Sequence, residues 1–247
     1  MAGHSKWAQI KRQKAAADFK KGATFSKLAR EIHVAVREGG PNPDANVRLR
    51  MAMERAKREG MPNDTIERAI AKASGAGSES ENYETVIYEG YGPGGVAVLA
   101  VALTDNRNRT ASEVRHAFTR HNGTLGETGC VAWQFETVGQ IVIAANGRDP
   151  DEVALLAIDA GATDVETADG EIVVTTDPAN LGDVTEQLRA AGLSIQAADI
   201  QRVPQSSIDL DGQQAQTALK LLEALEDLDD VQAVYTNANF PADLTNN

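Results

Sequence analysis

The apolar residues change their spacing near residue 80, and this change limits the architectures that the chain can adopt. Before that point they recur every three or four positions, as at Phe25, Leu28, Ile32 and Val36, which is typical of amphipathic helices. After it, β-rich segments alternate with helical ones. The Ser, Gly and Glu residues at positions 74–81 are typical of a linker. The sequence therefore predicts an α+β protein of several domains that begins with helices.

Turn and capping residues predict three helices in the first domain, residues 1–78. The first helix ends at the Gly-Gly-Pro sequence of residues 39–41, because this sequence does not continue a helix. Asn42 is expected to cap the second helix. The third helix follows Pro62 and ends near Gly75. Three short helices joined by tight turns predict a three-helix bundle.

Two α/β domains are predicted after the linker. Three strands and one helix are expected first, at residues 83–89, 96–103, 131–135 and 110–121. Thr110 is expected to cap that helix in a capping box with Glu113. The segments between residues 140 and 203 follow the order βαββαβ, which is typical of a ferredoxin-like domain.

The C-terminal region is expected to return to the middle domain. A helix at residues 213–225 and a strand at 231–236 can complete the sheet that begins at residue 83. The middle domain is therefore predicted to be discontinuous and to surround an inserted ferredoxin-like domain. The predicted boundaries are 1–78 for the basic helical domain, 79–136 plus 206–240 for the middle domain, and 137–205 for the insertion.

The charges are divided unevenly along the chain. The net charge is −12, yet residues 1–78 contain 16 Lys and Arg against 8 Asp and Glu. Such asymmetry indicates a basic part that faces a nucleic acid or a membrane surface. The acidic remainder would keep the molecule in solution and limit non-specific binding. The alternative is a basic helical face that is simply solvated.

The N-terminal segment is the main candidate for binding nucleic acid. Six basic residues lie between Lys6 and Lys21, with Asp18 as the single acid. Basic residues spaced along a segment neutralise successive phosphates and release counterions. Trp7 either stacks on an exposed base or anchors the segment to the bundle. The candidate binding residues of this domain are Lys6, Trp7, Lys11, Arg12, Lys14, Lys20, Lys21, Lys27 and Arg30.

A second candidate anion site joins a strand end to a helix start at residues 104–110. Free backbone N–H groups at a helix N-terminus attract anions. Arg107, Arg109 and Arg115 would add guanidinium donors for phosphate. The alternative is that these arginines bridge two domains by binding carboxylates.

The sequence offers little for catalysis or for holding a metal. The histidines lack the spacing of metal ligands, and they are His4, His33, His116 and His121. Cys130 precedes a predicted apolar strand and is expected to be a buried thiol. The acidic residues at 223–230 are expected to form a solvated helix end, with Mg²⁺ binding as the alternative. We therefore predict no enzymatic activity, no catalytic residue, no metal and no cofactor.

Residues 90–95 match the G-x-G-x-x-G pattern of dinucleotide sites, but they lead into a strand, so a glycine hairpin is predicted.

Other sequence features favour a cytoplasmic protein. No segment reaches the roughly 18 apolar residues that a membrane span needs. The single cysteine fits a reducing compartment. The basic N-terminus lacks the apolar core of a secretory signal, and a mitochondrial transit peptide is the alternative.

Several motifs of this chain resemble the YebC family. They include MAGHSKW at residues 1–7, FSKL at 25–28, ANVRL at 45–49, IERAI at 66–70, YEGYGPGG at 88–95 and TDNRNRT at 104–110. The resemblance is dense up to about Phe135 and looser up to Phe240. The chain departs from the usual pattern at residues 121–124 and at Cys130, which puts only local geometry in question.

The resemblance implies a helical N-terminal domain, two α/β domains and a bacterial cytoplasmic protein. Members of the family are usually described as transcriptional regulators that bind promoter DNA. Mitochondrial relatives are translational activators of cytochrome c oxidase, and some bacterial members are linked to ribosomes. Three functions therefore stay open: a DNA-binding transcriptional regulator, a translation factor that binds ribosomal RNA and helps elongation through difficult sequences, and a metal-dependent structure-specific nuclease.

Overall fold

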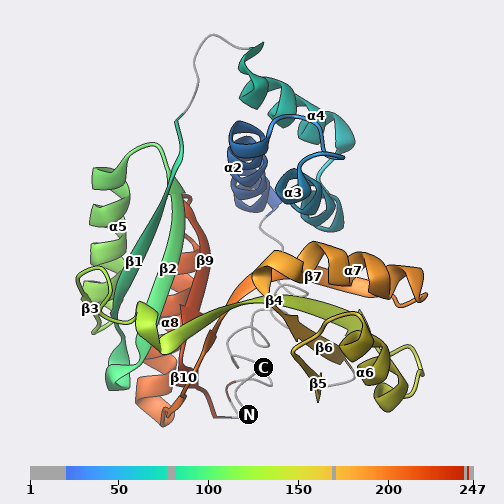
Figure 1. Ribbon diagram of the computed structural model, residues 1–247. Coiled ribbons are helices and arrows are strands. Elements are labelled where there is room, and N and C mark those ends of the chain that lie inside the picture. The colour runs from blue at the N-terminus through green and yellow to red at the C-terminus, as the bar shows by residue number, and fades with distance from the viewer. Residues whose placement is uncertain (1–20, 77–81, 169–170, 242–243, 245–247) are drawn as a thin grey trace. The chain divides into compact units, whose positions relative to one another are not determined.

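The computed structural model describes residues 21–76, 82–168, 171–241 and 244 (Figure 1). The chain divides into two compact units. One comprises Met1–Phe135 and Pro204–Asn247, and the other comprises Glu136–Val203. The predicted division of the first unit near residue 78 stays a prediction. None of the helices in the described ranges is both long enough and apolar enough to cross a bilayer.

The described part of the first unit begins with a bundle of three helices, as the sequence predicted. They are α2 (Lys21–Gly39), α3 (Val47–Arg58) and α4 (Asn63–Ala71), and α4 continues into a π-helical turn at Lys72–Ala76. Leu28, Ile32 and Val36 of α2 pack in one buried cluster with Leu49 of α3 and Ile66 of α4. The three-to-four spacing of apolar residues therefore does mark the core face of each helix.

The start of α3 differs from the prediction, because Asn46 and not Asn42 caps this helix. The Asn46 side chain accepts a hydrogen bond from the Leu49 amide at 3.0 Å. Its amide nitrogen donates to the carbonyl oxygens of Ala35 and Gly40, each at 2.8 Å. Asn42 only closes a local turn with the Asp44 amide. Asn46 takes the cap position because it also satisfies two carbonyls at the end of α2.

We expect Asn46→Ala to lower the free energy of unfolding by about 1–2 kcal/mol, the upper range for a lost helix cap. The buried carbonyl of Ala35 loses its donor in the same variant, which adds to the cost. Urea unfolding and hydrogen exchange at the Leu49 amide measure the effect. Asn42→Ala is the matched control, since Asn42 is exposed and makes only the local turn. Equal effects of both substitutions would contradict the assignment of the cap.

A four-stranded sheet follows in the order β3-β1-β2-β9. The strands are β1 (Glu84–Tyr91), β2 (Ala97–Thr104), β3 (Thr124–Leu125) and β9 (Val231–Thr236). β1 pairs antiparallel with β2 and β3, and β2 pairs antiparallel with β9. The C-terminal strand thus completes the sheet that begins near residue 83. The short strands β8 (Ile208–Asp209) and β10 (Ala238–Asn239) pair separately in parallel.

Two helices, α5 (Arg107–Arg120) and α8 (Gly212–Glu226), cover one face of this sheet. Val98 and Ala100 of β2 pack there against Phe118 of α5 and Leu221 of α8. The opposite face carries a smaller cluster that includes Leu99. The alternation of β2 side chains between two apolar clusters explains why this strand reads as a continuous apolar run. The predicted capping box is wrong, because α5 begins three residues before Thr110.

The predicted strand at residues 131–135 is also wrong. A 3-10 turn spans Ala132–Gln134, and a ten-residue strand, β4 (Phe135–Ala144), begins only after it. The buried carboxylate of Glu89 accepts hydrogen bonds from the amides of Gly129, Val131 and Ala132 at 2.7, 2.9 and 2.7 Å. Because these amides bind a side chain, they do not join a strand ladder.

The second unit has the predicted ferredoxin-like fold. Its elements are β4, α6 (Pro150–Asp159), β5 (Asp164–Ala168), β6 (Glu171–Thr176), α7 (Leu181–Ala190) and β7 (Ile195–Pro204). The sheet order is β5-β6-β4-β7, and β6 pairs antiparallel with both β4 and β5. The βαββαβ order of the sequence and this strand order together define the fold.

Candidate nucleic-acid interface

Part of the predicted interface lies outside the described residues. These positions are Lys6, Trp7, Lys11, Arg12, Lys14 and Lys20. Lys21 begins α2, but only its backbone belongs to the described structure. The roles of these seven residues stay predictions.

Lys27 and Arg30, one turn apart on α2, bind groups of the chain itself. The Lys27 ammonium donates to the carbonyl oxygen of Glu226 at the end of α8. The Arg30 guanidinium donates to the carbonyl oxygen of Asp229 and lies 3.2 Å from a carboxylate oxygen of Asp230. Carbonyl groups at a helix C-terminus carry partial negative charge and attract cations. Both side chains are therefore engaged where the sequence predicted contacts to phosphate.

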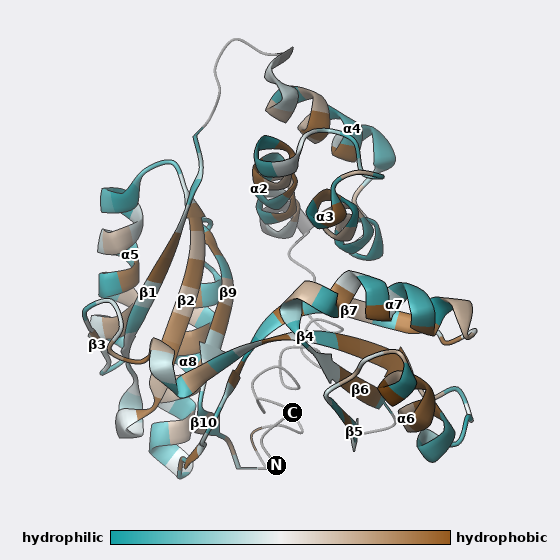
Figure 2. Cartoon of the chain, viewed as in Figure 1, coloured by the Kyte–Doolittle hydropathy of each residue, from teal (hydrophilic) through white to brown (hydrophobic). Residues whose placement is uncertain are grey.

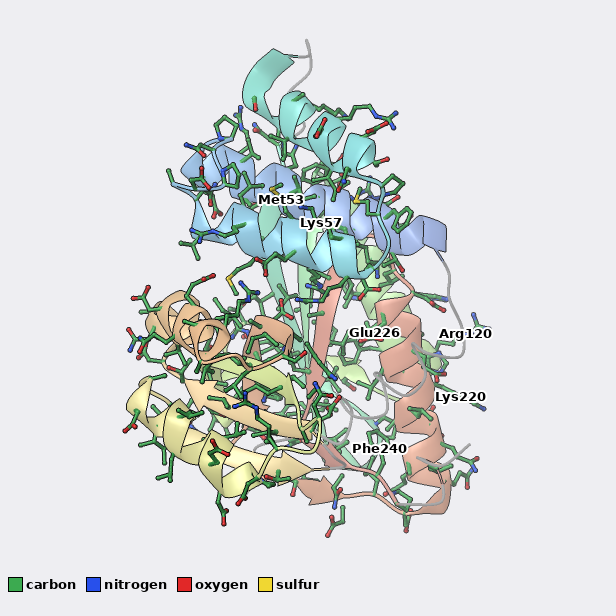
Figure 3. All side chains as sticks on the ribbon, turned by 90° about the vertical axis from the view of Figure 1, so that its right-hand side faces the viewer. Met53, Lys57, Arg120, Lys220, Glu226 and Phe240 are labelled. Carbon is green, nitrogen blue, oxygen red and sulfur yellow. The ribbon has the colours of Figure 1, made fainter. Side chains whose placement is uncertain are left out.

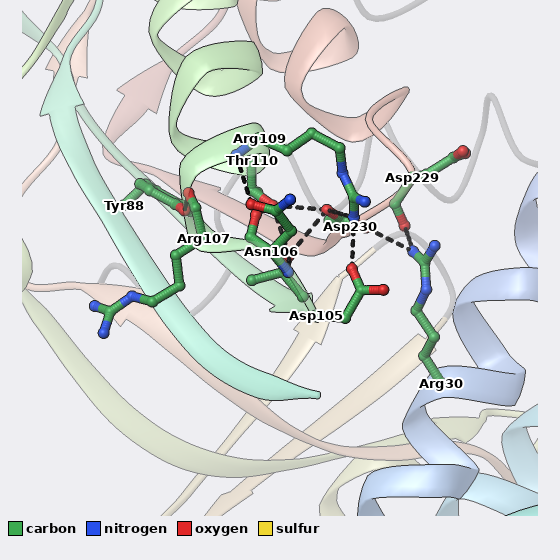
Figure 4. Close-up of polar contacts among 10 residues, drawn as sticks. Arg30, Tyr88, Asp105, Asn106, Arg107, Arg109, Thr110, Asp229 and Asp230 are labelled. Atoms are coloured by element: carbon green, nitrogen blue, oxygen red, sulfur yellow. Dashed lines mark hydrogen bonds and ion pairs between the residues drawn. The ribbon is translucent and has the colours of Figure 1, made fainter. Parts of the chain in front are cut away.

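Asp230 is the centre of a polar network that joins distant parts of the sequence (Figure 4). One carboxylate oxygen accepts hydrogen bonds from Thr110 at 2.6 Å, Arg109 at 2.8 Å and Thr104 at 3.1 Å. The side chain is only 3% exposed. Burial acts to raise the pKa of Asp230, but the hydrogen bonds from Thr110, Arg109 and Thr104 outweigh burial and hold this pKa below its ordinary value. The carboxylate is therefore ionised at neutral pH.

This network gives Arg109 a structural role at the start of α5. Arg109 binds the carboxylates of Asp105 and Asp230, each at 2.8 Å, and both raise the pKa of its guanidinium. Its backbone amide donates to the side chain of Asn106, which caps α5 in place of Thr110. At the helix N-terminus that was predicted to bind an anion, the Arg109 amide thus binds a side chain of the protein itself. Arg30 is the arginine that reaches across from the bundle.

Arg107 and Arg115 are the members of the second candidate site that extend toward solvent. The Arg107 side chain is 66% exposed and lies 3.6 Å from the Glu84 carboxylate. An exposed pair at this distance contributes little to stability. Arg115 is exposed on α5. The phosphate-binding role of these two arginines stays a prediction.

The most basic described helix is α3, which sequence reasoning did not select. Its twelve residues contain one acid and five basic residues, and the latter are Arg48, Arg50, Arg55, Lys57 and Arg58. The buried face of the helix consists of apolar residues, so the basic side chains occupy its other sides. Lys57 and Arg58 are exposed, and Figure 3 labels Lys57. The density of arginine between residues 48 and 58 was the signal that could have identified this helix.

Two cations of α3 form ion pairs with α2. Arg48 binds Glu38, and Arg55 lies 3.3 Å from Glu31. The basic residues in the last turn of α3 also favour the helix dipole. Part of this charge therefore stabilises the bundle, whereas Lys57 and Arg58 have exposed side chains.

A second basic cluster lies where the end of α5 meets α8. An ideal Cβ on Gly123, just after α5, would lie 3.2 Å from Leu221 of α8, so the two segments are in contact. His116, Arg120 and Lys220 project nearby, and Figure 3 shows the last two. Burial, followed by the charges of Arg120, Lys220 and His116, lowers the pKa of His121.

This lowered pKa predicts a loss of stability at mildly acidic pH. Unfolded His121 takes up a proton near its ordinary pKa of 6.5, whereas folded His121 does so only at lower pH. The free energy of unfolding therefore falls as the pH decreases through 6.5. Between pH 7.5 and 5.5, we expect the free energy of unfolding of His121→Gln, measured with urea, to decrease less than that of wild type. An unchanged pH dependence in His121→Gln would contradict the prediction.

The remaining candidates do not form a metal site in the described residues. No three His, Cys, Asp or Glu side chains in residues 21–76, 82–168, 171–241 and 244 gather closely enough to hold a metal ion. Cys130 is half-buried in a turn and does not lie in a strand. Burial, with the Glu89 charge in addition, raises the pKa of its thiol, so it is protonated at neutral pH.

The fold and its charges define a class of protein: a basic helical bundle joined to an α/β part that is interrupted by a ferredoxin-like unit. Two family models match the chain. The TACO1/YebC N-terminal domain matches residues 5–76, and the TACO1/YebC second and third domain matches residues 83–238. The chain belongs to the TACO1/YebC family, which confirms the resemblance seen in the sequence.

Relatives and a solved structure agree with this assignment. A probable transcriptional regulatory protein of Thermomicrobium roseum is 72% identical, covering 99% of this chain and 98% of the relative. One of Thermus thermophilus is 51% identical over 96% of both chains. The crystal structure of a conserved hypothetical protein from Aquifex aeolicus superimposes with a TM-score of 0.86 at 50% identity, covering 96% of this chain and 98% of that chain.

Proposed function

We propose that this protein regulates gene expression in the cytoplasm as a DNA-binding transcriptional regulator. The observation that carries the proposal is the positive charge of residues 1–78, which have 16 Lys and Arg against 8 Asp and Glu in a chain of net charge −12. Basic side chains bind the phosphate backbone and release its counterions. The relatives described as probable transcriptional regulatory proteins support the regulatory part.

Helix α3 is the proposed centre of the interface in the described residues. Its exposed cations, Lys57 and Arg58, are suited to phosphate contacts. The helix contains no Asn or Gln, the residues that read adenine in the major groove. We therefore expect the protein to bind mainly the phosphate backbone, with recognition of shape in place of a long base sequence.

A translation factor that binds ribosomal RNA is the second candidate. The same absence of Asn and Gln from α3 favours it, because structured RNA is recognised largely by shape and backbone. In this case the bundle would bind ribosomal RNA with the same basic surface.

Ultraviolet crosslinking in cells, followed by sequencing of both the recovered DNA and RNA, tests the proposal. Discrete promoter DNA with background RNA supports the transcriptional regulator. Enrichment of ribosomal RNA without promoter DNA overturns it in favour of the translation factor. Recovery of neither nucleic acid above an uncrosslinked control would contradict both.

The N-terminal cations provide a further prediction. Replacing Lys6, Lys11, Arg12 and Lys14 by alanine removes positive charges that can each neutralise one phosphate. We expect weaker binding to all sequences and a flatter dependence of log K on log salt concentration, by roughly 0.9 for each phosphate that is no longer neutralised. Fluorescence anisotropy with a labelled duplex measures both quantities. Unchanged affinity and slope would remove this segment from the interface.

We also propose that the protein acts by binding and not by catalysis. Asp230, the buried member of the acidic residues at 223–230, is engaged by Arg109, Thr104 and Thr110. This engagement leaves its carboxylate poorly placed for a metal ion. Incubation with branched DNA and MgCl₂ tests the point, because cleavage products that increase with protein concentration would indicate the nuclease.

A further inference from the structure

Helix α6 of the ferredoxin-like unit presents apolar side chains to solvent. Its sequence contains the run Val-Ala-Leu-Leu-Ala-Ile, of which Val153 and Ala157 are buried. Leu155 and Ile158 are 66% and 58% exposed, and residues three apart lie on the same side of a helix. Figure 2 shows α6 as predominantly hydrophobic. A surface helix normally carries polar residues on its outer face, so this face is suited to contact another molecule.

Acidic residues accompany this apolar pair on the same helix. Asp151 lies one turn before Leu155, and Asp159 lies one turn after it, so both border the exposed face. Asp151 and Glu152 also favour the N-terminal end of the helix dipole. Asp159 does not, since it stands in the last turn, where no basic residue is present. A contribution to helix stability therefore does not explain why an acidic residue occupies position 159.

The whole unit has the same sign of charge. Residues 136–203 contain 13 Asp and Glu against three arginines. In the described ranges, Asp151, Glu152 and Asp159 form no ion pair with a basic side chain. Nucleic acid and anionic lipid would be repelled by this surface. A second copy of α6 would place acid against acid, which disfavours self-association through this face.

We propose that the exposed face of α6 binds a basic amphipathic helix of a partner protein. Apolar side chains of the partner pack on Leu155 and Ile158, and its Lys or Arg side chains pair with Asp151 and Asp159. The charges steer the encounter, and the apolar contact holds the complex. This interaction uses another part of the chain than the proposed nucleic-acid interface and does not depend on it.

The probe for this proposal is a synthetic 18-residue amphipathic helix of Lys and Leu. Methyl-labelled full-length protein is titrated with it by NMR, and anisotropy gives the affinity. We expect the largest shift changes at the Leu155 and Ile158 methyl groups. The Leu155→Ser/Ile158→Ser variant and the Asp151→Asn/Asp159→Asn variant should each bind at least about tenfold more weakly. Val47→Ser, which changes an exposed valine of the bundle, is the matched control and should bind as wild type.

Other results overturn the proposal. Shift changes confined to other elements, or unchanged affinity in Leu155→Ser/Ile158→Ser, would place the peptide elsewhere. Equal affinity for a peptide with Ser in place of Leu would reduce the contact to charge alone. A wild-type dimer that the same double variant dissociates in sedimentation would make a second copy the occupant. The substituted residues are exposed, so melting temperature and circular dichroism should match wild type in every variant.

Discussion

Asp230→Ala is expected to lower the free energy of unfolding by about 3–5 kcal/mol, the range for breaking a buried ion pair. The variant leaves Arg109, Thr104 and Thr110 without their shared acceptor. These residues join the end of β2, the start of α5 and the start of β9. Urea unfolding, with hydrogen exchange at β2 and β9 as a local probe, measures the loss.

The control for this variant is Asp229→Ala. Asp229 is exposed, and its carbonyl oxygen rather than its side chain accepts from Arg30. We expect a change within about 0.5 kcal/mol, as for other surface substitutions. Similar losses in both variants would show that Asp230 is not the centre of the network.

Acidic pH should reduce the difference in the free energy of unfolding between wild type and Asp230→Ala. The folded-state pKa of Asp230 lies below its ordinary value of 3.8. The stabilisation that comes from the ionised carboxylate is therefore complete above the ordinary pKa and disappears as the pH falls through the folded-state pKa. The two proteins should accordingly converge in stability at strongly acidic pH.

Replacing Lys57 and Arg58 of α3 by glutamine is expected to weaken nucleic-acid binding at least about tenfold at low salt. If each of the two residues neutralises one phosphate, the slope of log K against log salt should fall by roughly 1.8, from 0.9 per phosphate. Anisotropy titrations with a labelled duplex and with structured RNA, each from 50 to 200 mM salt, measure both quantities. Glutamine is chosen because it keeps helix propensity.

A control variant that loses the same number of positive charges elsewhere tests whether the location of the cations matters, and not only the net charge. Arg120 and Lys220 are exposed on α5 and α8, and their replacement by glutamine also removes two positive charges. We expect this control to bind nearly as wild type. Equal weakening of the two variants would contradict α3 as the centre of the interface. A loss in the control alone would place the interface on the α5–α8 cluster.

Much of the architecture was predictable because it depends on local spacing. The apolar residues of α2 and α4 predicted a bundle, and the order of segments between residues 140 and 203 predicted the ferredoxin-like unit. The errors fell at element ends. Asn42 and Asn46 are both suitable caps, and the positions of the Ala35 and Gly40 carbonyls select Asn46. Residues 131–135 have strand propensity, but Glu89, about 40 residues earlier, binds the amides of Val131 and Ala132.

The candidate interface was less predictable than the fold. The sequence by itself determined the family, the helical and ferredoxin-like elements and the division into a basic and an acidic part, because motifs, periodicity and charge are properties of neighbouring residues. Only the tertiary structure decided that Arg109 and Arg30 meet Asp230, and that α6 exposes Leu155 and Ile158. Arg109 and Asp230 are 121 positions apart, and a hydrogen bond or a buried face depends on where such distant segments meet.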